Sequence, residues 1–398
     1  MKKTISTAAM SAIWLAASAL CGAGNALAAD QEPIIIGAAI AQSGFIAPYD
    51  TDPAKAAEMA IADINAKGGV LGRPFKMMYR DTKSDIAAGG VAAQELLDAG
   101  AKVIIVTGDF DFGGAAARAA NARNILAIAP FAADPKFGVR GIGPYAFSFS
   151  TASDTVGTAL AEFAHQKGWK TAYELNQTNI QYDKSVSAAF DSRFKELNGP
   201  ESVLGTDVFV MDDANIAPQI TRLKSLPKAP DVILLSAFTP AGPSALRQLR
   251  AAGIDIPVVS AEDMDGDYWA NAVPHLSNFF NAAMGSIYGD DSDASINDFI
   301  GRFKAKYGNH PATAHTLTGY SVIQGLARAM ERAKSVDSPA VKTEFEKFKR
   351  ENLLVGPTTF TKEVHITFDR PMTIIATSDG AHHFVEKLEL KKPVTPHP

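Results

Sequence analysis

The chain has 398 residues, enough for about two domains of ordinary size, and its formal net charge is −5. Hydrophobic residues make up 46% and charged residues 20% of it, values typical of a globular protein that argue against disorder. The acidic balance disfavours nucleic acid and anionic membranes as partners.

The first residues are typical of a secretory signal peptide. Two lysines precede an apolar segment (8–20) that is too short to span a bilayer, and residues 26–28 form the small-x-small pattern of a signal peptidase site. We therefore expect a leader over residues 1–28, cleaved near Ala28, and a periplasmic mature protein of charge −7 because both lysines leave. Cys21, the single cysteine, would leave as well, so no disulfide, thiolate metal site or cysteine nucleophile is expected.

The mature chain opens with a βαβ pattern. An apolar run (34–40) predicts a buried strand, an alanine-rich segment from Pro53 to Lys67 predicts a helix that begins at its proline, and residues 74–80 predict a second, parallel strand. Ligands bind where strands of open parallel sheets end in loops, so the loop 41–52 is the first candidate site. It contributes the candidate ligand contacts Ser43 and Tyr49.

The alternation of strands and helices then continues in two series. By residue 130 four strands have alternated with three helices, which predicts a doubly wound α/β sheet. A second series of similar length runs from about 153 to 288, as expected for two similarly built lobes. Three helices within 292–351 follow without strands, and the end (358–390) is strand-like with a turn at 378–380. Because these helices must pack on a sheet made earlier, we expect the chain to cross between the lobes several times.

Several motifs resemble one family. Residues 64–72 (Ile-Asn-Ala-Lys-Gly-Gly-Val-Leu-Gly) resemble the IN-x-x-GG-[IV]-x-G signature of the leucine/isoleucine/valine-binding proteins, the type I periplasmic solute-binding components of ABC importers. Residues 181–183 and 303–308, followed by Pro311, match its pattern too, and the likeness runs in order along the mature chain.

The resemblance implies an α/β fold of two Rossmann-like lobes with parallel sheets, joined by a three-strand hinge. The N-terminal lobe would comprise residues 29–149 and 290–371, and the C-terminal lobe residues 150–289 and 372–398. A monomer of this kind would close its lobes on a small-molecule solute and deliver it to a membrane permease, without a cofactor.

Two other functions stay open from the residues alone. One is a soluble periplasmic sensor that reports its ligand to a membrane receptor, and the other is an enzyme in the same fold. For an enzyme we find no Walker loop, nucleophile-elbow serine or HExxH motif. His310 and His315 lack the helical spacing of metal ligands and are expected at the surface, and packing is favoured over a cleft role for Tyr268 and Trp269.

The family's binding residues transfer to this sequence only in part. On the second lobe Glu262 falls where the amino acid binders hold the ligand's ammonium, and Tyr182 falls at a frequent cleft tyrosine. On the first lobe the family binds the ligand's carboxylate with a serine loop and an Ala-Ala-Thr turn, but this chain has Gly-Asp-Phe-Asp at 108–111 and Phe-Ala-Ala at 131–133. The further candidate contacts are Asp109, Phe110, Asp111, Phe131, Ala132, Phe238, Thr239 and Asp263.

The departures on the first lobe change the expected ligand. A carboxylate needs hydroxyl or N–H donors, and an aspartate repels it. Phe110 and Phe131 would narrow the space with aromatic walls. We therefore expect a cationic or neutral, amine or aromatic solute rather than an ordinary branched-chain amino acid. The alternative for Asp109 and Asp111 is that they only cap the next helix.

Overall fold

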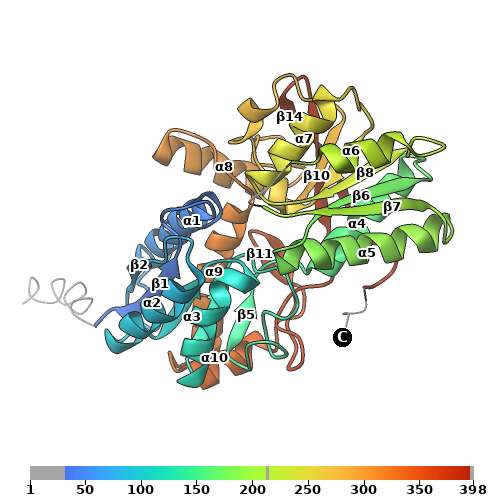
Figure 1. Cartoon of the computed structure of the whole chain (residues 1–398). Coiled ribbons are helices and arrows are strands. Elements are labelled where there is room, and N and C mark those ends of the chain that lie inside the picture. Colours follow the sequence, from blue (N-terminus) through green and yellow to red (C-terminus); the bar gives the residue numbers. More distant parts are fainter. Residues whose placement is uncertain (1–31, 212–214, 395–398) are drawn as a thin grey trace, which may run out of the picture.

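The computed structural model describes residues 32–211 and 215–394, which form two lobes that each contain one large β-sheet covered by helices on both faces (Figure 1); the first lobe also holds the two-stranded sheet β11-β12. The predicted leader lies outside the described residues. None of the helices in the described ranges has the length and apolar character needed to cross a lipid bilayer.

The first sheet is wholly parallel, with the strand order β2-β1-β3-β4-β5. Helices α2 and α3 pack on one face, and the other face shares one apolar core with α1, α8, α9 and α10. The three helices without strands between them therefore pack on the first sheet, as expected. The elements of this lobe are β1 (Ile34–Ile40), α1 (Ala47–Asn65), β2 (Phe75–Asp81), α2 (Ile86–Asp98), β3 (Val103–Val106), α3 (Phe110–Ala122), β4 (Leu126–Ala129), β5 (Ala146–Ser148), α8 (Ala294–Tyr307), α9 (His315–Ala333), α10 (Ser338–Phe345), β11 (Glu351–Leu353) and β12 (Gly356–Thr358).

The second sheet has the strand order β14-β13-β10-β9-β8-β6-β7 and is mixed rather than wholly parallel. Strand β13 returns from the first lobe and runs antiparallel to β10, and a tight turn pairs it antiparallel with β14. Helices α4 and α5 cover one face, and α6 and α7 cover the other. The elements are α4 (Ser153–Gln166), β6 (Ala172–Gln177), α5 (Gln181–Asn198), β7 (Val203–Phe209), α6 (Ala217–Lys224), β8 (Val232–Ser236), α7 (Ala241–Ala251), β9 (Val258–Ser260), the short 3₁₀ helices η1 (Glu262–Met264) and η2 (Ala270–Ala272), β10 (Phe279–Ala283), β13 (Met372–Ser378) and β14 (Ala381–Leu388).

Helix α1 begins earlier than predicted. It starts at Ala47, with Pro48 in its first turn, and Pro53 lies inside it. The expectation that Pro53 opens the helix was therefore wrong, because Pro48 already occupies the position where a missing N–H is harmless. Asp50 holds the first turn in place by accepting hydrogen bonds from the backbone N–H groups of Ala41 (2.7 Å) and Gly108 (3.2 Å). As a result Tyr49 projects from a helix rather than from a loop.

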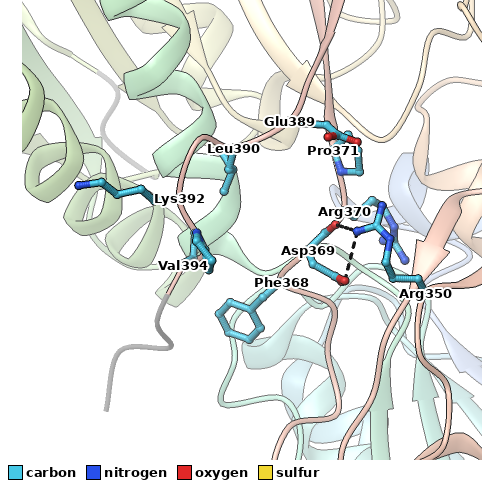
Figure 2. Close-up of a pocket in the computed structure, with 10 residues that line it drawn as sticks. Arg350, Phe368, Asp369, Arg370, Pro371, Glu389, Leu390, Lys392 and Val394 are labelled. Atoms are coloured by element: carbon cyan, nitrogen blue, oxygen red, sulfur yellow. Dashed lines mark hydrogen bonds and ion pairs between the residues drawn. The ribbon is translucent and has the colours of Figure 1, made fainter.

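Three chain segments cross between the lobes, at 149–152, 284–293 and 359–371. Arg370, in the third crossing, is fully buried and joins all three. Its guanidinium donates to the Phe149 carbonyl oxygen (2.9 Å) and lies 3.8 Å from the Met284 sulfur. Figure 2 shows Arg370 beside the C-terminal segment 389–394, with its neighbour Asp369 bonded to Arg350. One buried cation thus ties the hinge together.

The lobes touch across the cleft in this structure. The Asp111 carboxylate accepts from the backbone N–H of Gln181 (2.9 Å), and the Ser185 hydroxyl donates to Asp134 (2.5 Å). At the hinge side, Asp265 accepts from the N–H of Ala314 (2.6 Å). These contacts define a closed arrangement of the two lobes.

Candidate functional site

A small cavity lies where the carboxyl ends of strands from both sheets meet. Its volume is about 10 Å³, room for about one water molecule, so a solute can enter only when the lobes separate. The first lobe supplies residues from the loops after β3 and β4 and the first residue of α9. The second lobe supplies residues from the segments after β8 and β9 and one residue from the start of α5. The lining residues are Gly108, Asp109, Phe131, Ala133, Tyr182, Phe238, Glu262, Asp263 and His315.

Glu262 is the most exceptional of these residues. Its side chain is buried, and neither carboxylate oxygen has a hydrogen-bond partner among the described residues. The Nε2 atom of His315 lies 4.0 Å from its Oε2, too far for a hydrogen bond. Burial raises the pKa of Glu262 well above its usual range, and the nearby Asp265 raises it further. A buried carboxyl that faces a cavity without a partner is suited to accept a donor from a guest.

A second acid of the second lobe, Asp263, lines the cavity, and Asp183 lies next to it outside the lining. Asp263 accepts from the hydroxyl of Ser260 (3.3 Å), and burial raises its pKa to about 7. Asp183, which was not predicted, lies beneath it, and the two share the hydroxyl of Ser236 (3.4 Å to each). Burial and the charge of Asp263 raise the pKa of Asp183 well above its usual range. Carboxyl groups are therefore concentrated on this side of the cavity.

The two aspartates of the first-lobe loop have different positions. Asp109 caps α3, because its carboxylate accepts from the N–H groups of Asp111 (2.8 Å) and Phe112 (3.2 Å), and it also lines the cavity. Burial raises its pKa to about 7, and Asp111 contributes. Asp111 does not line the cavity and instead holds the first residue of α5 across the cleft. Asp109 therefore both caps α3 and lines the cavity.

Aromatic rings form the walls. Tyr182 and Phe238 lie with ring centroids 5.8 Å apart, and Phe131 lies 4.5 Å from the imidazole of His315. Phe131 needs Gly108 opposite, since a Cβ there would come within 2.1 Å of its ring. A cation within about 6 Å of such faces is attracted to them.

The expectation that His315 lies at the surface was wrong. It begins α9, which brings it between the lobes, and only 4% of it is exposed. Burial lowers its pKa to about 3, so the imidazole is neutral at pH 7. His310 is half-buried, and its ion pair with Asp267 (3.2 Å) raises its pKa. No group of three or more His, Cys, Asp or Glu side chains in the described ranges has the geometry to hold a metal ion.

Three hydroxyl groups lie next to the cavity without lining it, and we call Tyr49, Thr239 and Tyr268 the hydroxyl wall. Tyr268 donates to Tyr49 (2.9 Å) and lies 2.8 Å from the Thr239 hydroxyl, while Tyr49 donates to the carbonyl oxygen of Asp263 (2.6 Å). Because Tyr49 belongs to the first lobe and the other two to the second, this wall also joins the lobes. Tyr268 therefore has a place at the cleft beyond ordinary packing.

Six predicted contacts do not line the cavity: Tyr49 and Thr239 lie next to it, and Asp111, Ser43, Phe110 and Ala132 lie farther away. Ser43 is exposed and donates to Asp81 (2.8 Å). Phe110 is half-buried and packs against the first lobe's core, and Ala132 is fully buried within that core while the following Ala133 lines the cavity. Successive side chains of an extended segment point to opposite sides, so Ala133 faces the cavity and the predicted Ala132 faces the core.

Comparisons with known proteins agree with this architecture. A family model described as "Periplasmic binding protein" matches residues 33–381. The Leu/Ile/Val-binding protein of Escherichia coli K12 is 24% identical over 86% of this chain and 89% of its own length, and a homologue from Brucella melitensis is 24% identical over 82% and 85%.

Two solved structures share the fold. A branched-chain amino acid transporter substrate-binding protein from Streptococcus pneumoniae, in complex with isoleucine, has a TM-score of 0.77 at 22% identity and covers 89% of this chain and 99% of its own. A solute-binding protein from Rhodopseudomonas palustris, in complex with benzoate, has a TM-score of 0.75 at 18% identity and covers 92% and 98%. The chain belongs to the periplasmic binding protein family, so it is a binding protein rather than an enzyme.

Proposed function

We propose that this protein is a periplasmic receptor that closes its two lobes on a small solute carrying an ammonium group and an aromatic or apolar body. The observation that carries the proposal is the Glu262 carboxyl, buried without a hydrogen-bond partner and turned to a cavity that both lobes line. An ammonium would supply the missing donors and the opposite charge.

The charges around the cavity support a cation over an anion. Asp109, Glu262 and Asp263 line it, and no lysine or arginine is among its described lining residues. His315 is neutral, so it offers no charge to a carboxylate. A bound cation would keep these carboxyls ionised and would be attracted to them, whereas an anionic solute would be repelled by every carboxyl that is ionised, in a dry site where electrostatic effects are largest. In this respect the site differs from what a binder of simple carboxylates needs.

Closure would follow from contacts that only the closed form completes. Glu262 and Phe238 belong to the second lobe, and Phe131 and Asp109 to the first, so each lobe alone holds half of the solute. A solute shifts the open–closed equilibrium only by its differential affinity for the closed form. Arg370, which contacts all three crossings, would be the fixed point of this motion.

The cellular context forms part of the same proposal. The leader 1–28 would direct the chain to the periplasm, where a monomer would present its solute to a membrane permease. The lobes would divide as residues 29–149 with 290–371 and residues 150–289 with 372–398. The arrangement of the two sheets and of the three crossings between them supports this division.

The proposal is tested by identifying the solute. Mass spectrometry of small molecules released from purified, denatured protein should show an amine. A thermal-shift screen of amines, aromatic acids and amino acids should then give its largest increase in Tm with amines, since a ligand that binds only the folded state stabilises it. A larger shift with leucine or valine than with any amine would contradict the cationic interpretation of the site.

A further inference from the structure

An open groove of about 710 Å³ lies on the outer side of the hydroxyl wall. Thr239 and Tyr268 line the groove, while the adjoining Phe238 and Asp263 line the inner cavity. Tyr49 connects the two, because its hydroxyl contacts both Thr239 (3.2 Å) and the Asp263 carbonyl oxygen. The inner cavity and this outer groove are therefore separated by one layer of side chains.

The chemistry of the outer groove is unlike that of the inner cavity. The first lobe contributes Phe45 and Pro48, and the second contributes Pro240, Pro243 and Trp269. Among the described residues that line the outer groove, Arg247 is the only charged one. An apolar chain would lose contact with water here, whereas an ammonium group would gain no acidic partner from these residues.

The wall between the two spaces has one exposed member. Tyr268 is 36% exposed, and hydrogen bonds at its hydroxyl hold it to Thr239 and Tyr49. Tyr49 is fully buried, so it cannot swing aside without disturbing the cleft. Rotation of the Tyr268 ring would cost its two hydrogen bonds and would uncover the Tyr49 hydroxyl on the side of the outer groove.

We propose that the outer groove is a second subsite, which takes the apolar tail of an elongated primary amine whose ammonium lies at Glu262, with Tyr268 as the movable part of the wall. This inference rests on the proposed function and adds to it the class of solute. The ammonium group would match the carboxyl groups that line the inner cavity, and the apolar tail would match the apolar side chains that line the outer groove.

Isothermal titration calorimetry with n-butylamine, n-hexylamine and n-octylamine tests the proposal. Each methylene that enters the outer groove should strengthen binding roughly fourfold. If n-butylamine binds and the longer amines bind no more tightly, the outer subsite is wrong while the proposed function stands. If none of the amines binds, both are wrong.

A substitution within the outer groove supplies the matched control. Ala272 lines the groove and is half-buried, so Ala272→Trp should fill the space and reduce the affinity ratio of n-octylamine to n-butylamine to near one. An unchanged ratio in the folded variant would overturn the proposal.

Fluorescence gives a second measurement that needs no substitution in the groove. In a Trp169→Phe background Trp269 is the only tryptophan of the mature chain, and it lines the outer groove. We expect n-octylamine to shift its emission and n-butylamine to leave it unchanged. Equal responses to the two amines would contradict occupation of the groove by the tail.

Discussion

Replacing Glu262 by glutamine should have opposite effects on binding and on stability. The substitution keeps the shape of the side chain and removes the charge that an ammonium would meet. Loss of one partner of a buried charge pair costs about 2–5 kcal/mol, which corresponds to a roughly 30-fold to several-thousand-fold weaker affinity for an amine. In the ligand-free protein the carboxyl has no hydrogen-bond partner, so the uncharged amide should leave the Tm unchanged or raise it.

The assay is calorimetric titration of an amine together with thermal denaturation of both proteins. Glu174→Gln is the matched control, since Glu174 is another buried acid of the second lobe with a raised pKa but does not line the cavity. The control should bind the amine as the wild type does. An unchanged affinity of Glu262→Gln for the amine would refute the role given to this carboxyl. A clear drop in the Tm of the ligand-free variant would refute it as well, because the carboxyl would then stabilise the fold.

Three further outcomes are expected. Folding raises the pKa of Asp109 and Asp263 from 3.8 to about 7, so the folded protein retains protons that the unfolded chain loses. The Tm of the ligand-free protein should therefore fall as the pH rises from about 4 to 7, and calorimetry at several pH values checks this. His315 and carboxyls whose pKa folding lowers, such as Asp231, oppose the trend. Gly108→Ala should displace the Phe131 ring and weaken amine binding roughly tenfold, as measured by calorimetry. Its control is Gly301→Ala, at a helical position with open space, which should stabilise the protein by about 0.5–1 kcal/mol in denaturant titrations. Arg370→Met should destabilise it by about 3 kcal/mol, because several buried acceptors lose their donor; a change under 1 kcal/mol would contradict its role in the hinge.

The fold could largely be predicted because its signals are local. Apolar runs and glycine-terminated helices follow one another along the chain, and the turn at 378–380 has the left-handed residues that its sequence predicts (Asp379, φ 49°, and Gly380, φ 77°). The start of α1 was missed because two prolines compete for the first turn, and local sequence does not decide between them. The antiparallel β13 depends on the third crossing, which no local pattern encodes.

The candidate site was less accessible to sequence reasoning. Glu262 and Tyr182 were reached through a family resemblance, and the residues themselves carry no spacing that would join them. His315 was assigned to the surface because its spacing from His310 is not that of metal ligands, whereas its burial comes from its position between the lobes. Asp183 was missed for the same reason, since its partner Asp263 is brought near only by the sheet.

Binding of benzylamine and of benzoate, compared by titration calorimetry at pH 7.5, tests the central claim most directly. The two ligands have the same ring and opposite charges, so the acids that line the cavity should decide between them. The account predicts that benzylamine binds and that benzoate gives no measurable heat. Binding of benzoate without binding of benzylamine would contradict it.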